Sequence, residues 1–146
     1  MGTLKRAKKN LTAAAKKIQH VNILRGTVRE ILVDLDGDKL ADVGLIDTTG
    51  DGNIDMLALD LNGDNEFNLY FADTDGSGRP DITFMDEKSD GNLKLVGIRD
   101  YLQDDMTQKA AAVYSVLTDK EASEDILVSA LGELCDVVAE ARIAYR

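Results

Sequence analysis

A block of thirteen residues occurs five times in succession without an insertion, and this periodicity constrains the fold more than any other feature of the chain. Each block contains nine acidic, glycine-bearing residues followed by four mostly apolar ones, and each begins with an aspartate: Asp34, Asp47, Asp60, Asp73 and Asp86. A fixed period of this kind indicates repeated structural units that stack on one another and share a core. We therefore expect a series of acidic loops joined by short strands.

The apolar ends of the blocks predict five short strands, at 43–46, 56–59, 69–72, 82–85 and 95–98. The β-branched segment 27–33 predicts a sixth strand before them, in a degenerate copy over 21–33 whose loop lacks carboxylates. If every loop reverses the chain, the six strands form an antiparallel meander with two apolar faces. Both faces then need cover, from flanking helices or from a second subunit. A calcium-stacked β-solenoid, with all loops along one edge, is the alternative.

The segments on either side of the repeats have helical spacing. Apolar residues recur at intervals of three and four over residues 3–20, which predicts a basic amphipathic helix. We expect it to dock on its own domain, with a partner helix or a membrane surface as alternatives. Residues 104–146 predict two more helices, one at about 106–117 and one from 119 onward.

The length of 146 residues fits a single α+β domain over residues 1–146, with the repeats at 21–98. The net charge of −10 is unevenly placed, because residues 1–20 hold six Lys/Arg and no acid. Residues 34–98 hold sixteen Asp/Glu against four Lys/Arg, so nucleic acid is disfavoured as a partner. No apolar run approaches the ~20 residues of a membrane span. The sequence identifies no protein partner, and self-association through the helices is a further possibility.

Oxygen-bearing side chains stand at positions one, three, five and nine of the loops, and a glycine at position four permits a sharp bend. Calcium prefers six to eight hard oxygen ligands in a flexible geometry, so alternate side chains and a carbonyl near position seven suit it. We expect about three or four Ca²⁺ ions, with loop five left without one because Lys88 and Lys94 occupy ligand positions. The candidate metal ligands are Asp34, Asp36, Asp38 and Asp42 in loop one; Asp47, Thr49, Asp51 and Asp55 in loop two; Asp60, Asn62, Asp64 and Asn68 in loop three; and Asp73, Asp75, Ser77 and Asp81 in loop four.

The pattern D-x-D-G-D-x-x-x-D between short apolar strands resembles the calcium-binding β-hairpin loops of the integrin-α FG-GAP family and similar bacterial tandem repeats. The resemblance covers residues 34–94 and does not extend to the helices. It implies that the side chains at positions one, three, five and nine, with the carbonyl at seven, hold one ion per loop. An ordinary EF-hand is excluded, because its loop needs a glutamate at position twelve. Position twelve here holds Leu45, Ala58, Phe71, Phe84 and Gly97.

The loop pattern admits two other interpretations. Asp-Gly pairs are good hairpin turns without any ion, but a turn does not need carboxylates at four alternating positions. Residues 31–40 also resemble the first motif of haloacid-dehalogenase-type phosphatases, although Asp38 replaces the expected threonine and no helix is predicted to follow. With His20 as the only histidine, no catalytic set is visible, and we expect a protein that is not an enzyme.

The sequence therefore predicts a calcium-binding repeat protein. Three roles stay open: a structural module, a calcium-dependent adhesion or partner-binding module, and a sensor whose helices undock when the ions leave. Millimolar affinity would fit a constitutive extracellular role, and micromolar affinity would fit a sensor. We expect an extracellular or cell-surface location in a bacterium, with a cytoplasmic location as the alternative.

Overall fold

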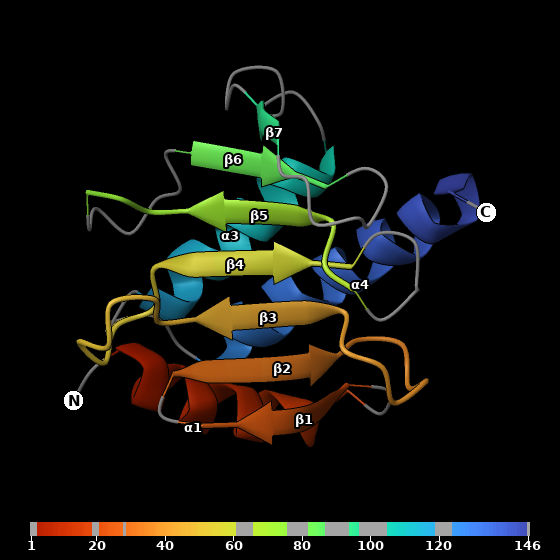
Figure 1. Ribbon diagram of the computed structural model, residues 1–146. Coiled ribbons are helices and arrows are strands. Elements are labelled where there is room, and N and C mark those ends of the chain that lie inside the picture. The colour runs from red at the N-terminus through yellow and green to blue at the C-terminus, as the bar shows by residue number, and fades with distance from the viewer. Residues whose placement is uncertain are drawn as a thin grey trace.

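The thirteen-residue repeats form one antiparallel sheet in the computed structural model shown in Figure 1. The structure describes residues 3–18, 21–27, 29–60, 66–75, 82–86, 94–96, 105–118 and 124–145. Within these residues, seven strands follow one another across the sheet in chain order. The strands are β1 Asn22–Gly26, β2 Glu30–Asp34, β3 Val43–Ile46, β4 Met56–Leu59, β5 Leu69–Ala72, β6 Ile82–Met85 and β7 Lys94–Val96. The antiparallel meander predicted from the repeats is confirmed.

Strands β3 to β6 have the bounds that the repeat period predicts. Strand β2 overlaps the predicted 27–33 but begins only at Glu30, because Thr27 lies in the turn before it, and β7 overlaps the predicted 95–98. Strand β1 is additional, since the sequence predicted only a degenerate loop there. It pairs with β2 from Asn22 opposite Asp34 to Gly26 opposite Ile31. The reversal between them is tight: Thr27 donates its N–H to the Glu30 carbonyl at 2.8 Å and accepts the Glu30 N–H on its hydroxyl at 3.0 Å. This short turn at Thr27 therefore reverses the chain and allows residues 22–26 to form an additional strand.

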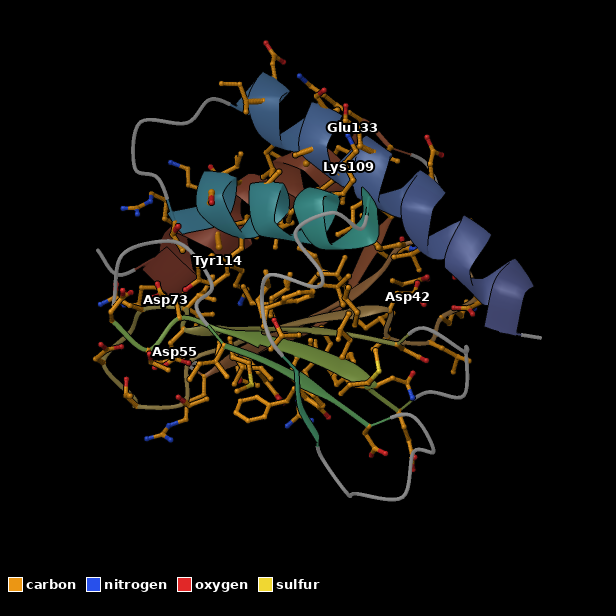
Figure 2. The ribbon with its side chains drawn as sticks, turned by 90° about the horizontal axis from the view of Figure 1, so that it is seen from above. Asp42, Asp55, Asp73, Lys109, Tyr114 and Glu133 are labelled. Atoms are coloured by element: carbon orange, nitrogen blue, oxygen red, sulfur yellow. The ribbon has the colours of Figure 1, made fainter. Side chains whose placement is uncertain are left out.

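One face of the sheet supplies most of the core. Its side chains are almost fully buried under the helices, and Figure 2 shows all three helices on this side. The buried residues of this face are Ile31, Val33, Val43, Leu45, Leu57, Leu59, Leu69 and Phe71. The opposite face carries partly exposed apolar side chains on the same strands: Leu32, Ile46, Met56, Tyr70, Ile82 and Phe84. The helices therefore cover one of the two apolar faces that the sequence predicted.

The helices are α1 Thr3–Ala15, α3 Asp105–Thr118 and α4 Glu124–Tyr145. Helix α1 is shorter than the predicted 3–20, and residues 19 and 20 lie outside the described part of the chain. Its apolar stripe is buried in the domain's own core, as predicted for a docked helix. No helix in the described ranges is both long and apolar enough to cross a membrane.

Polar contacts fix the helices relative to one another. Arg6 of α1 donates to the Thr118 carbonyl at the end of α3, at 3.1 Å, which satisfies one of the carbonyls that a helix end leaves unpaired. Lys109 of α3 and Glu133 of α4 form an ion pair at 3.2 Å, visible between the two helices in Figure 2. The three helices thus form one layer over the buried face.

Candidate metal centre

The acidic loops lie in two rows, one at each edge of the sheet. Consecutive strands run in opposite directions, so consecutive loops must alternate between edges. We call the edge with loop one (34–42), loop three (60–68) and Asp86, where loop five begins, the first row, and the edge with loop two (47–55) and loop four (73–81) the second row. Neighbouring loops of a row are two strands apart, about 10 Å. The β-solenoid alternative is therefore wrong, because it would place all loops along one edge.

A repeated backbone hydrogen bond links the loops of each row. In the first row, the N–H of Asp60 donates to the carbonyl of Asp42 at 2.9 Å, and the N–H of Asp86 donates to that of Asn68 at 2.6 Å. In the second row, the N–H of Asp73 donates to the carbonyl of Asp55 at 2.9 Å. Position one of each later loop is thus tied to position nine of the loop before it in the same row.

Position one is buried in all five loops, with at most 8% exposure. In loop one, Oδ1 of Asp34 accepts the N–H groups of Asp36 at 3.1 Å and Gly37 at 2.9 Å. Its Oδ2 accepts the N–H of Lys39 at 3.0 Å. The first aspartate therefore organises its own loop, folding the backbone around its carboxylate.

Loop one brings four carboxylates together. Asp42, fully buried at position nine, accepts the N–H of Leu35 on Oδ2 at 2.6 Å, while Asp36 and Asp38 are exposed at the loop tip. One oxygen from each of Asp34, Asp36, Asp38 and Asp42 lies within 4.8 Å of the other three. Hard oxygen ligands at this spacing suit a hard divalent cation. This cluster could hold a metal ion, and it is the only such group within the described residues.

Hydrogen bonds keep the first aspartates of loops one and two ionised. Burial works against the charged form of Asp34, but the N–H groups of Lys39, Gly37 and Asp36 outweigh it and lower the pKa of this carboxyl below its ordinary value. Burial acts on Asp47 in the same way, and the N–H groups of Gly52 and Gly50 again lower the pKa. Both groups are therefore anionic at neutral pH and available to a cation.

The backbone hydrogen bonds of loop two follow those of loop one, but the carboxylates of loop two lie further apart. Oδ1 of Asp47 accepts the N–H of Gly50 at 2.9 Å and the hydroxyl of Thr49 at 3.3 Å. Asp51 is exposed, and Asp55 is turned toward Thr48, whose N–H and hydroxyl both donate to it. Its carboxylates do not converge as closely as those of loop one. The sequence predicted that both loops would hold an ion, with four candidate ligands in each.

Loops three and four are described in part. Asp60 and Asn68 of loop three are buried, as is Asp73 of loop four, while Asp75 is exposed. The other predicted ligands of these loops lie outside the described residues: Asn62, Asp64, Ser77 and Asp81.

Two features of the site were not predicted from the sequence. Position six adopts a positive φ, 67° at Lys39 and 85° at Gly52, as does the glycine at position four. Its signal was the frequency of Gly and Asn at position six of the other loops. The second feature is Tyr114, whose hydroxyl reaches two loops of the second row. The sequence around Tyr114 carries no local signal of this contact.

Comparison of the chain with protein-family models, with curated protein sequences and with solved structures finds no match. The interpretation of the site therefore depends on its own geometry.

Proposed function

We propose that this chain is a non-enzymatic calcium-binding repeat protein in which ions in the loops stabilise the sheet. The observation that carries the proposal is the convergence of four loop-one carboxylates within 4.8 Å. Calcium suits this cluster better than Mg²⁺, which demands near-ideal octahedral geometry and gives up its water reluctantly. The proposal extends to loops two, three and four through the repeat, in the manner of FG-GAP-like calcium loops.

The charge distribution supports a structural role for the ions. Position-one carboxylates are buried in every loop and recur about 10 Å apart along each row. Like charges fixed at that spacing repel one another and work against the folded state. Four Ca²⁺ ions would offset most of the net charge of −10. Ion binding to the folded loops would then add directly to the free energy of unfolding.

A structural ion needs a compartment in which calcium is plentiful. Affinity in the millimolar range would be sufficient outside a cell, where calcium is high. We therefore propose an extracellular or cell-surface location in a bacterium, with the ions bound constitutively.

The test is calorimetric titration of chelator-treated protein with Ca²⁺ and separately with Mg²⁺, with melting temperatures recorded on the same samples. We expect three or four Ca²⁺ per chain, a clear rise in melting temperature, and little response to Mg²⁺. No Ca²⁺ binding together with an unchanged melt would refute the proposal.

A pair of variants assigns one ion to loop one. The double substitution Asp36→Ala and Asp38→Ala removes two exposed ligands and should lower the number of Ca²⁺ ions bound per chain by one. The matched control, Asp125→Ala with Asp136→Ala, removes the same charge from exposed positions of α4 and should keep every ion. Equal loss of binding in both variants would show that general charge, and not loop one, attracts the ion.

A further inference from the structure

Tyr114 joins helix α3 to both loops of the second row. Its side chain is fully buried, and its hydroxyl lies 2.8 Å from the carbonyl oxygen of Ile54 and 3.2 Å from Oδ2 of Asp73. Ile54 is position eight of loop two, and Asp73 is position one of loop four. Figure 2 places Tyr114, Asp73 and Asp55 at one edge of the sheet, with Asp42 at the opposite edge.

The two loops and the helix are linked by hydrogen bonds around this hydroxyl. The phenol proton lies between two acceptors, so it donates to the Ile54 carbonyl and to the Asp73 carboxylate. The backbone N–H of Asp73 donates in turn to the carbonyl of Asp55, the neighbour of Ile54, at 2.9 Å. Movement of α3 at Tyr114 must therefore disturb both loops, and movement of Asp73 must disturb α3.

A second helix, α1, also contacts loop two. The N–H of Leu4, in the first turn of α1, donates to the carbonyl of Gly52 at 3.1 Å. Gly52 and Ile54 are positions six and eight, so α1 and α3 fix the carbonyls that flank Asn53 at position seven. Position seven is where the proposed ion takes its backbone ligand. The helices thus restrain the part of loop two that must be correctly oriented for binding.

We propose that Tyr114 couples helix α3 to cation binding in the second row, by orienting Asp73 as a ligand of loop four and by fixing the Ile54 carbonyl of loop two. This inference rests on the proposed calcium-binding function. A carboxylate that binds a cation through one oxygen is commonly held by a hydrogen bond to the other, and Tyr114 supplies that bond. Binding of the ion then stabilises the docked helix, and by linkage the docked helix raises the affinity for the ion.

The substitution Tyr114→Phe tests the link, because it keeps the buried ring and removes only the hydroxyl. In calcium titration of the chelator-treated protein, we expect the affinity of at least one site to fall about 10-fold or more, as for other residues that hold a metal ligand. The affinity assigned to loop one should not change. Tyr70→Phe is the matched control, since Tyr70 is partly exposed on the other face and its hydroxyl donates, among the residues that the structure describes, to the Phe67 carbonyl at 3.4 Å.

Hydrogen exchange of the α3 backbone separates coupling from simple stabilisation. In the wild-type protein and in Tyr70→Phe, Ca²⁺ should slow exchange of the α3 amides, and in Tyr114→Phe this response should be lost. A merely structural hydroxyl would lower the melting temperature of Tyr114→Phe but leave its calcium affinities and its α3 response unchanged. That result would overturn the inference.

A second variant keeps the test decisive if Tyr114→Phe folds poorly. Asp73→Asn retains a hydrogen-bond partner for Tyr114 but removes the charge, so it should reduce the calcium response of α3 to the part that passes through the Ile54 carbonyl of loop two, while the helix stays docked. A response of wild-type size in Asp73→Asn would refute the coupling through loop four. Absence of calcium binding by the wild-type protein would instead refute the proposed function, which distinguishes the two failures.

Discussion

Oδ2 of Asp47 accepts a hydrogen bond of 2.8 Å from the backbone N–H of Gly52, five residues further along the same loop. In loop one, Oδ2 of Asp34 accepts the equivalent bond from Lys39 at 3.0 Å. Both donors have positive φ, a conformation that glycine adopts freely and that costs other residues free energy. The buried aspartate at position one therefore depends on a left-handed residue at position six.

The substitution Gly52→Ala measures this dependence. Apart from its two chain neighbours, no heavy atom of the described residues lies within 4 Å of the position that the new Cβ would occupy, so the cost comes from the backbone conformation. We expect a loss of about 1 kcal/mol in the free energy of unfolding, measured by urea denaturation of the metal-free protein.

Gly132→Ala provides the control with the same chemical change. Gly132 lies inside α4, and apart from the adjacent backbone of that helix its added Cβ would meet no heavy atom within 4 Å in the described part of the chain. Alanine is the better helix former by about 1 kcal/mol, so this variant should be more stable than the wild-type protein. Two changes of the same sign would contradict the left-handed conformation at position six.

The sequence predicted the sheet well, for a physical reason. The four apolar residues after each loop form a strand, and only its alternate side chains point to the same face of the sheet. The constant period of thirteen residues brings adjacent strands into register. Thus Leu45 lies opposite Leu57, and Leu57 opposite Phe71, in the register expected for a meander. Strand β1 could not be predicted from the period, because it lies in the copy that has lost the repeat pattern.

Only those parts of the site whose residues are close together in the sequence could be predicted from it. The ligands of loop one are close in sequence, and alternation alone brings Asp34, Asp36 and Asp38 together. The contact of Tyr114 with Asp73 spans 41 residues and depends on how α3 docks, which no local pattern specifies. The orientation of Asp55 toward Thr48 likewise depends on side-chain hydrogen bonds that compete with convergence.

The lowered pKa values of Asp34 and Asp47 predict loss of stability in acid. The ordinary pKa is 3.8, and both groups lie below it in the folded state. The unfolded chain therefore binds more protons in this range, and stability rises with pH there. The contribution is fully present above about pH 4 and is lost as the pH falls through the lower folded pKa values. Urea unfolding of metal-free protein between pH 2 and pH 7 measures it.

Asp47→Asn identifies the group responsible. The amide places an NH₂ where a carboxylate oxygen accepted backbone N–H groups, which should cost about 1 to 3 kcal/mol at pH 7. It should also flatten the acid dependence. Asp125→Asn is the control, since that side chain is 89% exposed and should change neither property. An acid dependence that is equally steep in Asp47→Asn would exclude this residue as its source.

Replacement of Thr83 should stabilise the folded protein. Thr83 is fully buried on the helix-covered face of β6, and its hydroxyl has no hydrogen-bond partner in the described part of the chain. An unsatisfied buried hydroxyl costs free energy, and valine has nearly the same shape without it. Thr83→Val should raise the free energy of unfolding by about 1 kcal/mol. Thr118→Val, which removes a hydroxyl that donates to the Tyr114 carbonyl at 3.0 Å, should not be stabilising.

The thiol of Cys135 should be nearly inert in the folded protein. Burial raises its pKa, and the neighbouring carboxylate of Asp136 raises it further, from 9.0 to about 12. Because the thiolate is the nucleophile, a rise of this size makes the reactive form roughly 1,000-fold scarcer at pH 8. Iodoacetamide should therefore alkylate the native protein far more slowly than the urea-unfolded chain. Asp136→Asn should accelerate the native reaction several-fold, whereas Asp125→Asn should not. Similar rates for the native and unfolded protein would show that α4 does not hold Cys135 in this environment.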